Sequence, residues 1–252
     1  VKSPLKAKPL KNPGESLERR LLDVRLDRIL LPSMTAMMLL AWSALEWIRW
    51  LYDTPPAPKT ISGIALVFVC WATIKIYLAT KEIKLIKLGI ASEKAVGQFL
   101  ERLRVDGAEV FHDIQGENFN LDHVVIHKSG VYVVETKSLS KPLSGKTELL
   151  YNGSEVLRNG KALPRNPVIQ VSAASGWLRQ LIYESTGRRV VVKGIVTFPG
   201  WYIHSNHNTP KNTVWVLNPK AIPAFIANQP EKLTSEDVHL MKFHIGQYIR
   251  SM

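Results

Sequence analysis

Cysteine is almost absent from this chain of 252 residues, in which Cys70 carries the only thiol. A single cysteine excludes an intramolecular disulfide and any zinc site built mainly from cysteine. The sequence also lacks a Gly-x-x-x-x-Gly-Lys phosphate loop, a Gly-x-Ser-x-Gly elbow and a His-Glu-x-x-His pair. P-loop ATPases, serine hydrolases with that elbow and zinc hydrolases with that pair therefore have no support.

Acidic residues are in the minority. The chain has 33 Lys and Arg against 21 Asp and Glu, which gives a formal charge of +12. Such a balance favours an anionic partner, either nucleic acid or an anionic membrane surface, and composition alone does not choose between them. The length allows one sizeable core and an additional element.

Two apolar runs interrupt an otherwise polar N-terminal third. Residues 1–28 are polar and basic, and the first dozen, with prolines at positions 4, 9 and 13 in and directly after them, are expected to be disordered. Residues 29–51 and 61–80 are apolar, and as helices they would measure about 34 and 30 Å, against roughly 30 Å of bilayer hydrocarbon. The sequence therefore predicts a transmembrane helical hairpin over residues 29–80, in contact with the lipid bilayer.

The charges around the two runs predict an orientation. Basic residues flank the outer ends of the pair, whereas the connection between the runs carries one lysine and one aspartate. The positive-inside rule then places both termini on the cytoplasmic side of the cell (inner) membrane. The alternative is a helical hairpin buried inside a soluble fold.

The remaining residues, 81–252, have the pattern of an α/β domain. An amphipathic helix is expected from Ser92, a plausible N-cap, to Leu103. Residues 120–137 then contain two β-branched runs, 124–126 and 131–134, on either side of a Lys-Ser-Gly turn signal. This pattern predicts a β-hairpin.

Three charged residues lie at the open end of this hairpin. Glu135 and Lys137 point to the same face because side chains alternate along a strand. If the loop has an even number of residues, Asp122 of the first strand lies on that face as well. Charges on a packed face of a strand usually have a partner or a function.

An aspartate, a hairpin and Glu-x-Lys together resemble the catalytic core of the PD-(D/E)XK nuclease superfamily. The wording LDHVVI at 121–126 and GVYVVETK at 130–137 is similar to the nuclease-related domain (NERD) family within it. The resemblance covers about residues 87–198. It implies an α/β, restriction-endonuclease-like fold with a mixed central sheet flanked by helices, and nuclease activity.

Two further family positions are found on either side of the hairpin. The run Gly89-Ile90-Ala91-Ser92-Glu93 resembles the family's Gly-x-x-Gly-Glu, with serine in place of the second glycine. Residues 166–170, NPVIQ, resemble its Asn-Pro-x-x-Gln and provide Gln170. Without the resemblance, Glu93 would be a favourable first-turn acid and Gln170 an ordinary polar helix residue.

The resemblance implies a metal-dependent site. Asp122 and Glu135, with the Thr136 carbonyl, would bind Mg²⁺ or Mn²⁺, because hard divalent ions prefer oxygen ligands. Glu93 would bind a second ion or a metal-bound water. The implied role of Lys137 is to orient the attacking water or help deprotonate it, and that of Gln170 is to hold Lys137 or a substrate phosphate.

Basic residues between the Glu-x-Lys strand and the Gln170 helix are expected to contact phosphates of nucleic acid. They are Lys141, Lys146, Arg158, Lys161 and Arg165. A solvated basic surface is the simpler alternative, and the absence of a base-reading module predicts little sequence specificity. His204 and His207, in an expected loop, could form part of a substrate edge, whereas His123 and His127 should face away from Asp122.

These observations predict a membrane-anchored, metal-dependent nuclease. DNA is favoured over RNA by the resemblance alone. The rival hypothesis is a non-catalytic, membrane-tethered nucleic-acid-binding or scaffold protein that keeps the fold. Homo-oligomerisation is left open.

Overall fold

A computed structural model of the chain describes residues 10–52, 57–116, 119–142, 147–205 and 214–251. The chain divides into two compact units, Ser16–Leu88 on the one hand and residues up to Glu15 with Gly89–Met252 on the other. The division therefore falls at Leu88, whereas the sequence predicted bounds at residues 28 and 80. We call them the helical unit and the α/β unit.

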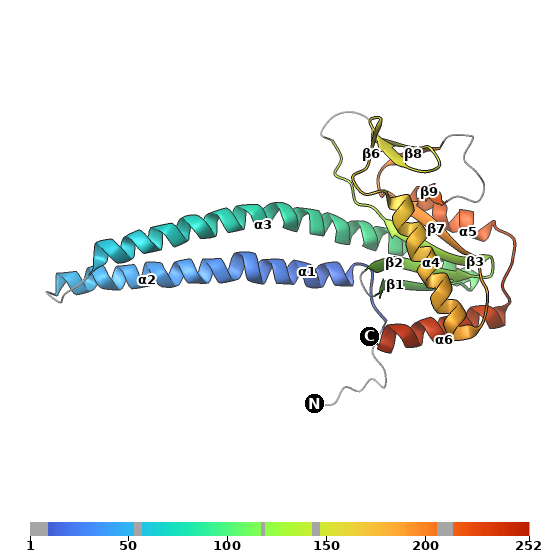
Figure 1. The fold of residues 1–252 in the computed structure, drawn as a ribbon, viewed down its shortest axis with the longest axis horizontal. Helices are drawn as coiled ribbons and strands as arrows, with labels where there is room; N and C mark the ends of the chain where they lie inside the picture. The colour runs from blue at the N-terminus through green and yellow to red at the C-terminus, as the bar shows by residue number, and fades with distance from the viewer. Residues whose placement is uncertain (1–9, 53–56, 117–118, 143–146, 206–213, 252) are drawn as a thin grey trace. The chain divides into compact units, whose positions relative to one another are not determined.

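The helical unit begins with one almost unbroken helical run (Figure 1). Helix α1 (Glu15–Arg25) passes through a π-helical turn, η1 (Leu26–Leu30), into α2 (Leu31–Leu51). Pro32 cannot donate to the carbonyl four residues earlier, and its ring would clash there. The π turn, in which the Leu31 N–H donates to the Leu26 carbonyl, precedes this proline and takes up the mismatch.

The second long helix, α3 (Pro58–Leu100), is fastened to α2 by polar contacts near the connection between them. The Ser43 and Ser62 hydroxyls lie 2.8 Å apart, and the Trp47 indole N–H donates to Ser62 at 3.0 Å. The Glu46 carboxylate accepts the Ala57 N–H at 3.2 Å. Most large apolar side chains of the pair are exposed, and both helices are long and apolar enough to cross a bilayer.

The expected helix start at Ser92 is wrong. Helix α3 runs without a break through Gly89 and Ser92, and Ser92 is buried inside it. Residues 81–88, between the second apolar run and Gly89, are Lys, Glu, Leu and Ile. A single glycine costs a helix only about 1 kcal/mol relative to alanine, so the helix continues through Gly89. A 3-10 turn, η2 (Glu101–Asp106), follows, and Gly107 ends it with a φ of 79°.

The α/β unit is built on a five-stranded mixed sheet (Figure 1). In spatial order its strands are β1 (Glu109–Gln115), β2 (Asn120–His127), β3 (Gly130–Thr136), β7 (Val192–Thr197) and β9 (Trp215–Leu217). Strand β2 is antiparallel to its neighbours β1 and β3, whereas β7 and β9 run parallel to β3. The predicted mixed sheet is confirmed.

Helices cover both faces of this sheet, as the apolar runs of β3 and β7 require. Helices α4 (Pro167–Thr186) and α6 (Ser235–Ser251) pack on one face through a core that includes Val133 and Leu178. The end of α3 and the short α5 (Ile222–Ala227) pack on the other through Val134 and Leu100.

A second, smaller sheet decorates this core. Its order is β6 (Lys161–Ala162), β5 (Val156–Arg158), β4 (Glu148–Tyr151) and β8 (Tyr202–Ser205). The segment at 202–205 was expected to be a loop. It is a strand because it pairs in parallel with β4, a contact between residues about fifty positions apart.

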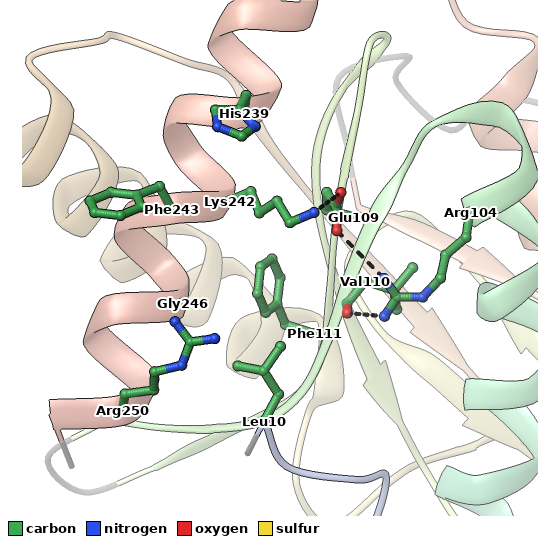
Figure 2. Close-up of a pocket in the computed structure, with 10 residues that line it drawn as sticks. All are labelled: Leu10, Arg104, Glu109, Val110, Phe111, His239, Lys242, Phe243, Gly246 and Arg250. Carbon is green, nitrogen blue, oxygen red and sulfur yellow. Dashed lines mark hydrogen bonds and ion pairs between the residues drawn. The ribbon is translucent and has the colours of Figure 1, made fainter. Parts of the chain in front are cut away.

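Helix α6 is tied to the edge strand β1 around a cavity of about 170 Å³ (Figure 2). The Lys242 ammonium lies 2.6 Å from the Glu109 carboxylate, and the Arg104 guanidinium donates to the Val110 carbonyl at 2.6 Å. The Phe111 and Phe243 side chains contribute apolar wall. These contacts cover an edge that would otherwise be open to pairing.

Candidate active site

The β2–β3 turn determines which side chains meet. His127 pairs with Gly130, so the loop is the two-residue Lys128-Ser129, an even number. The same register, continued past His123 and Val134, places Asp122 opposite Glu135. The Asp122 carboxylate accepts the Thr136 backbone N–H at 2.7 Å, which holds it beside Glu135.

Lys137 directly follows the last residue of β3. Its ammonium is 2.7 Å from the Glu135 carboxylate, and the two side chains are 27% and 14% exposed. The backbone N–H of Lys137 donates to the Thr197 carbonyl of β7 at 2.9 Å. The structure thus brings Asp122, Glu135 and Lys137 together where the strands end, with the ammonium still reachable from solvent.

Glu93 joins this group from α3. Burial raises the pKa of Glu93 to about 7, and repulsion by the Asp113 and Glu135 carboxylates adds to the effect. The backbone N–H of Gly14 and the charge of Lys137 act in the opposite direction. Near neutral pH, Glu93 is therefore close to half protonated when no cation is present.

Asp122 is affected in the same way. Desolvation raises the pKa of Asp122 well above its usual value, and repulsion from Glu135 and Glu93 raises it further. The Thr136 N–H and the Lys137 charge favour the ionised form but do not outweigh these effects. The site therefore combines three carboxyl groups, those of Glu93, Asp122 and Glu135, with the single ammonium of Lys137, and a bound cation would favour the ionised carboxylates.

Asp113 is a member of the cluster that the sequence analysis missed. It lies in β1 between the His112–His123 and Ile114–Leu121 pairs, and its carboxylate repels that of Glu93. Its backbone has a φ of 52°, it is buried, and it accepts a hydrogen bond from the Asn120 amide. The available signal was a single aspartate inside an apolar strand.

The N-terminal segment also reaches this site. The Lys11 ammonium lies 3.9 Å from Asp113, and Pro13 lies so close to Gly97 that a Cβ there would be 2.7 Å from its ring. Disorder was expected for residues 1–12, but residues 10–12 are ordered against the α/β unit. Residues 1–9 lie outside the described residues.

Gln170 lies in the first turn of α4. Asn166 caps this helix by accepting the Val168 N–H at 3.0 Å, and Pro167 follows the cap, as the Asn-Pro signal indicates. Within the described part of the chain, the buried Oε1 atom of Gln170 has no hydrogen-bond partner. An unpaired buried acceptor costs about 1–3 kcal/mol, so a donor in a complex would stabilise it.

The histidines of β2 face away from Asp122, as predicted. Nδ1 of His123 lies 2.8 Å from Nδ1 of His112, and its Nε2 lies 3.3 Å from the Thr136 hydroxyl. Burial lowers the pKa of both rings, so they are neutral structural groups near pH 7. His127 is bonded to the Ser129 hydroxyl at 2.7 Å on the same face.

The predicted phosphate-contacting residues are spread over the unit. Lys141 lies against Gly200, just beyond the end of β7, and the Arg158 guanidinium lies 4.8 Å from the centre of the Trp201 ring. Lys161 and Arg165 are exposed. Lys146 lies outside the described residues, as does His207.

The donor chemistry fits a hard divalent ion. In the described ranges, no three His, Cys, Asp or Glu side chains are arranged to hold a metal ion. Two opposed carboxylates and a backbone carbonyl are nevertheless a suitable set for Mg²⁺, which usually retains several of its waters. Burial, and secondarily repulsion between the carboxylates, raises the pKa of Glu93 and of Asp122, and a bound cation would favour their ionised forms.

Comparison with known families matches residues 88–199 to the nuclease-related domain, NERD. The matched segment contains Glu93, Asp122, Glu135, Lys137 and Gln170, and it confirms the recognition made from the sequence motifs. No curated protein and no solved structure matches the chain.

Proposed function

Residues 88–199 form a nuclease-related domain, and from this premise we propose that the protein is a membrane-anchored, metal-dependent nuclease acting on DNA. The observation that carries the proposal is the meeting of Asp122, Glu135 and Lys137 at the strand ends inside the matched segment. Carboxylates opposed across a hairpin, with an ammonium beside them, suit phosphodiester hydrolysis.

Asp122 and Glu135, with the Thr136 carbonyl, are the proposed ligands of Mg²⁺ or Mn²⁺. When bound, such an ion neutralises phosphate charge and lowers the pKa of a coordinated water. The Thr136 N–H fixes the orientation of the Asp122 carboxylate. Glu93, whose pKa is raised to about 7, would bind a second ion or a metal-bound water.

Lys137 and Gln170 complete the proposed machinery. The Lys137 ammonium, held by Glu135, orients the attacking water and offsets charge on the phosphate. The unpaired amide oxygen of Gln170 accepts from the Lys137 ammonium, or the amide turns and donates to a substrate phosphate.

The proposed substrate follows from charge. A formal charge of +12 favours a polyanion, and exposed Lys161 and Arg165, with Lys141 near the strand ends, are proposed to contact phosphates. Phosphate contacts position nucleic acid without reading its sequence, so low sequence specificity is expected. DNA is preferred to RNA on family resemblance.

The proposed anchor consists of α2 and the first part of α3. Both are apolar with exposed side chains, and the positive-inside rule places the nuclease-related domain on the cytoplasmic side of the inner membrane. At the cytoplasmic end, Glu82 forms ion pairs with Arg20 at 3.0 Å and with Arg28 at 2.5 Å. These pairs join α1 and the π turn η1 to α3 where the helices would leave the bilayer.

The test uses the full chain in detergent micelles with supercoiled, linear and single-stranded DNA and with RNA, in Mg²⁺, Mn²⁺ or EDTA. Divalent-dependent cleavage that is lost in Asp122→Ala and in Lys137→Ala supports the proposal. Lys128→Ala is the matched control, because it removes an exposed lysine in the β2–β3 turn, at the opposite end of the hairpin from the carboxylates. Binding without cleavage in either metal, unchanged in both variants, would instead identify a scaffold protein.

A further inference from the structure

A groove of about 440 Å³ lies beyond the ends of β7 and β9. It is bounded by α3 on one side and by the segments that follow the two strands on the other. The residues that define it here are Ala95, Phe99, Pro199, Tyr202, Pro219 and Lys220. We call it the strand-end groove.

The strand-end groove is close to the carboxylates. Thr136, Thr197 and Leu217 pair in one row across β3, β7 and β9, so these strands end together. Neighbouring strands are about 4.8 Å apart, which puts the end of β9 roughly 10 Å from that of β3. A few nucleotides bound at Glu135 and Lys137 would therefore be long enough to reach the groove.

The charges of the groove complement a nucleotide. Its lining contains no acidic residue within the described ranges, and Lys220 lies on its wall. A Cβ on Gly200, another wall residue, would lie 3.0 Å from the Lys141 ammonium. The Arg102 guanidinium lies 5.0 Å from the centre of the Phe99 ring. An apolar floor with a cationic rim suits a base and its phosphate.

Tyr202 offers a stacking surface. Its side chain is 63% exposed, and its ring centre lies 4.6 Å from that of His204 in an edge-to-face arrangement. Two polar side chains of the groove are already bonded within the protein: Asn218 donates to the Trp201 carbonyl at 3.3 Å, and the Trp201 indole donates to the Leu139 carbonyl at 3.1 Å. The groove can thus hold a base without reading its edge.

We propose that the strand-end groove binds an unpaired base of single-stranded DNA, stacked on Tyr202, with adjacent phosphates on Lys141 and Lys220. A base inside a duplex has both faces covered, so only a single strand or an opened end can fill the groove. The identification of the ligand as DNA rests on the proposed nuclease function. The groove makes single-stranded or frayed DNA the preferred substrate.

The test measures binding of a fluorescent oligothymidine to the full chain in detergent, in a Lys137→Ala background that prevents cleavage. A duplex and an RNA of equal length are the comparison ligands. Tyr202→Ala should weaken single-strand binding about tenfold and leave duplex binding nearly unchanged. Tyr202→Phe, which keeps the aromatic ring, should bind the single strand as tightly as the protein with Tyr202 does. Lys220→Gln should reduce the slope of log affinity against log salt by about one. Tyr183→Ala is the matched control. It removes an exposed tyrosine of α4, outside the groove, and should not change single-strand binding.

Equal losses for duplex and single strand in Tyr202→Ala, or no loss in either, would overturn the inference. RNA bound as tightly as DNA would overturn the assignment to DNA. The outcomes separate the two proposals. If the wild type cleaves DNA and Tyr202→Ala does not change single-strand binding, the proposed nuclease function stands and the proposed role of the groove is wrong. If single-strand affinity depends on Tyr202 but no metal supports cleavage, the proposed role of the groove stands and the proposed nuclease function is wrong.

Discussion

Glu93 shares its buried position with other carboxylates, and this makes the stability of the α/β unit depend on pH in a defined direction. Burial, followed by Asp113 and Glu135, raises the pKa of Glu93 from 4.5 to about 7. The folded protein therefore holds a proton on Glu93 more tightly than the unfolded chain does. The contribution of this bound proton to the stability of the folded protein is complete below pH 4.5 and is lost as pH rises through 7.

The expected magnitude follows from the size of the shift. A change from 4.5 to about 7 corresponds to about 3 kcal/mol, at about 1.4 kcal/mol per pKa unit. This is an upper limit, because water and nearby side chains relax around the new charge. For a unit of this size, 1 kcal/mol moves the melting temperature by roughly 2–4 °C, so the expected fall is as much as about 10 °C.

The assay compares thermal unfolding of the wild type and of Glu93→Gln from pH 5 to pH 8, in detergent and in EDTA. Glutamine has nearly the same shape but does not titrate, so the variant should lose less stability across this range. At pH 8 it should be the more stable protein. Subtracting the two curves removes the contribution of groups that titrate in both proteins.

Two parallel curves would refute the argument, because they would mean that Glu93 is ionised throughout this range. A wild type that gains stability between pH 5 and pH 7 relative to Glu93→Gln would refute it as well. That result would require an opposite charge near Glu93 that outweighs burial.

Four further predictions concern the metal, the N-terminal segment, Gly200 and α6. Saturating Mg²⁺ at about 100 times its dissociation constant should stabilise the wild type at pH 8 by about 2.7 kcal/mol in a melting assay, whereas Asp122→Asn should gain much less. Gly97→Ala should push Pro13 away and remove the Gly14 hydrogen bond from Glu93, so a carboxyl NMR titration should show a still higher pKa; an unchanged pKa would contradict the contact. Gly200→Ala should cost about 1–2 kcal/mol in urea denaturation, because its φ is 79°, and it should weaken single-stranded DNA binding by displacing Lys141; full affinity would count against the groove. Lys242→Met should cost less than about 1 kcal/mol, since its ion pair with Glu109 is partly exposed (Figure 2), and a larger loss would show that this pair fastens α6.

The arrangement of the hairpin residues could be predicted from the sequence because it depends on local rules. Side chains alternate along a strand, and a two-residue loop fixes the register. Asp122 therefore had to face Glu135 once the loop was Lys128-Ser129. The two apolar runs predicted long helices for a similar reason, since length and composition determine whether a segment can span a bilayer.

The surroundings of Glu93 could not be predicted in this way. Asp113, Gly14 and Glu135 meet Glu93 only because distant segments pack together, and no spacing along the chain records such a contact. The strand at 202–205 also depends on pairing with β4, which lies outside its own sequence window.

The sequence by itself determined which residues carry charge and how the hairpin presents them. Only the tertiary structure decided how strongly those charges interact, because burial and repulsion depend on the neighbours that folding brings close. The strand-end groove has the same origin. Four separate parts of the chain form its walls, and its apolar floor and basic rim exist only when they are assembled.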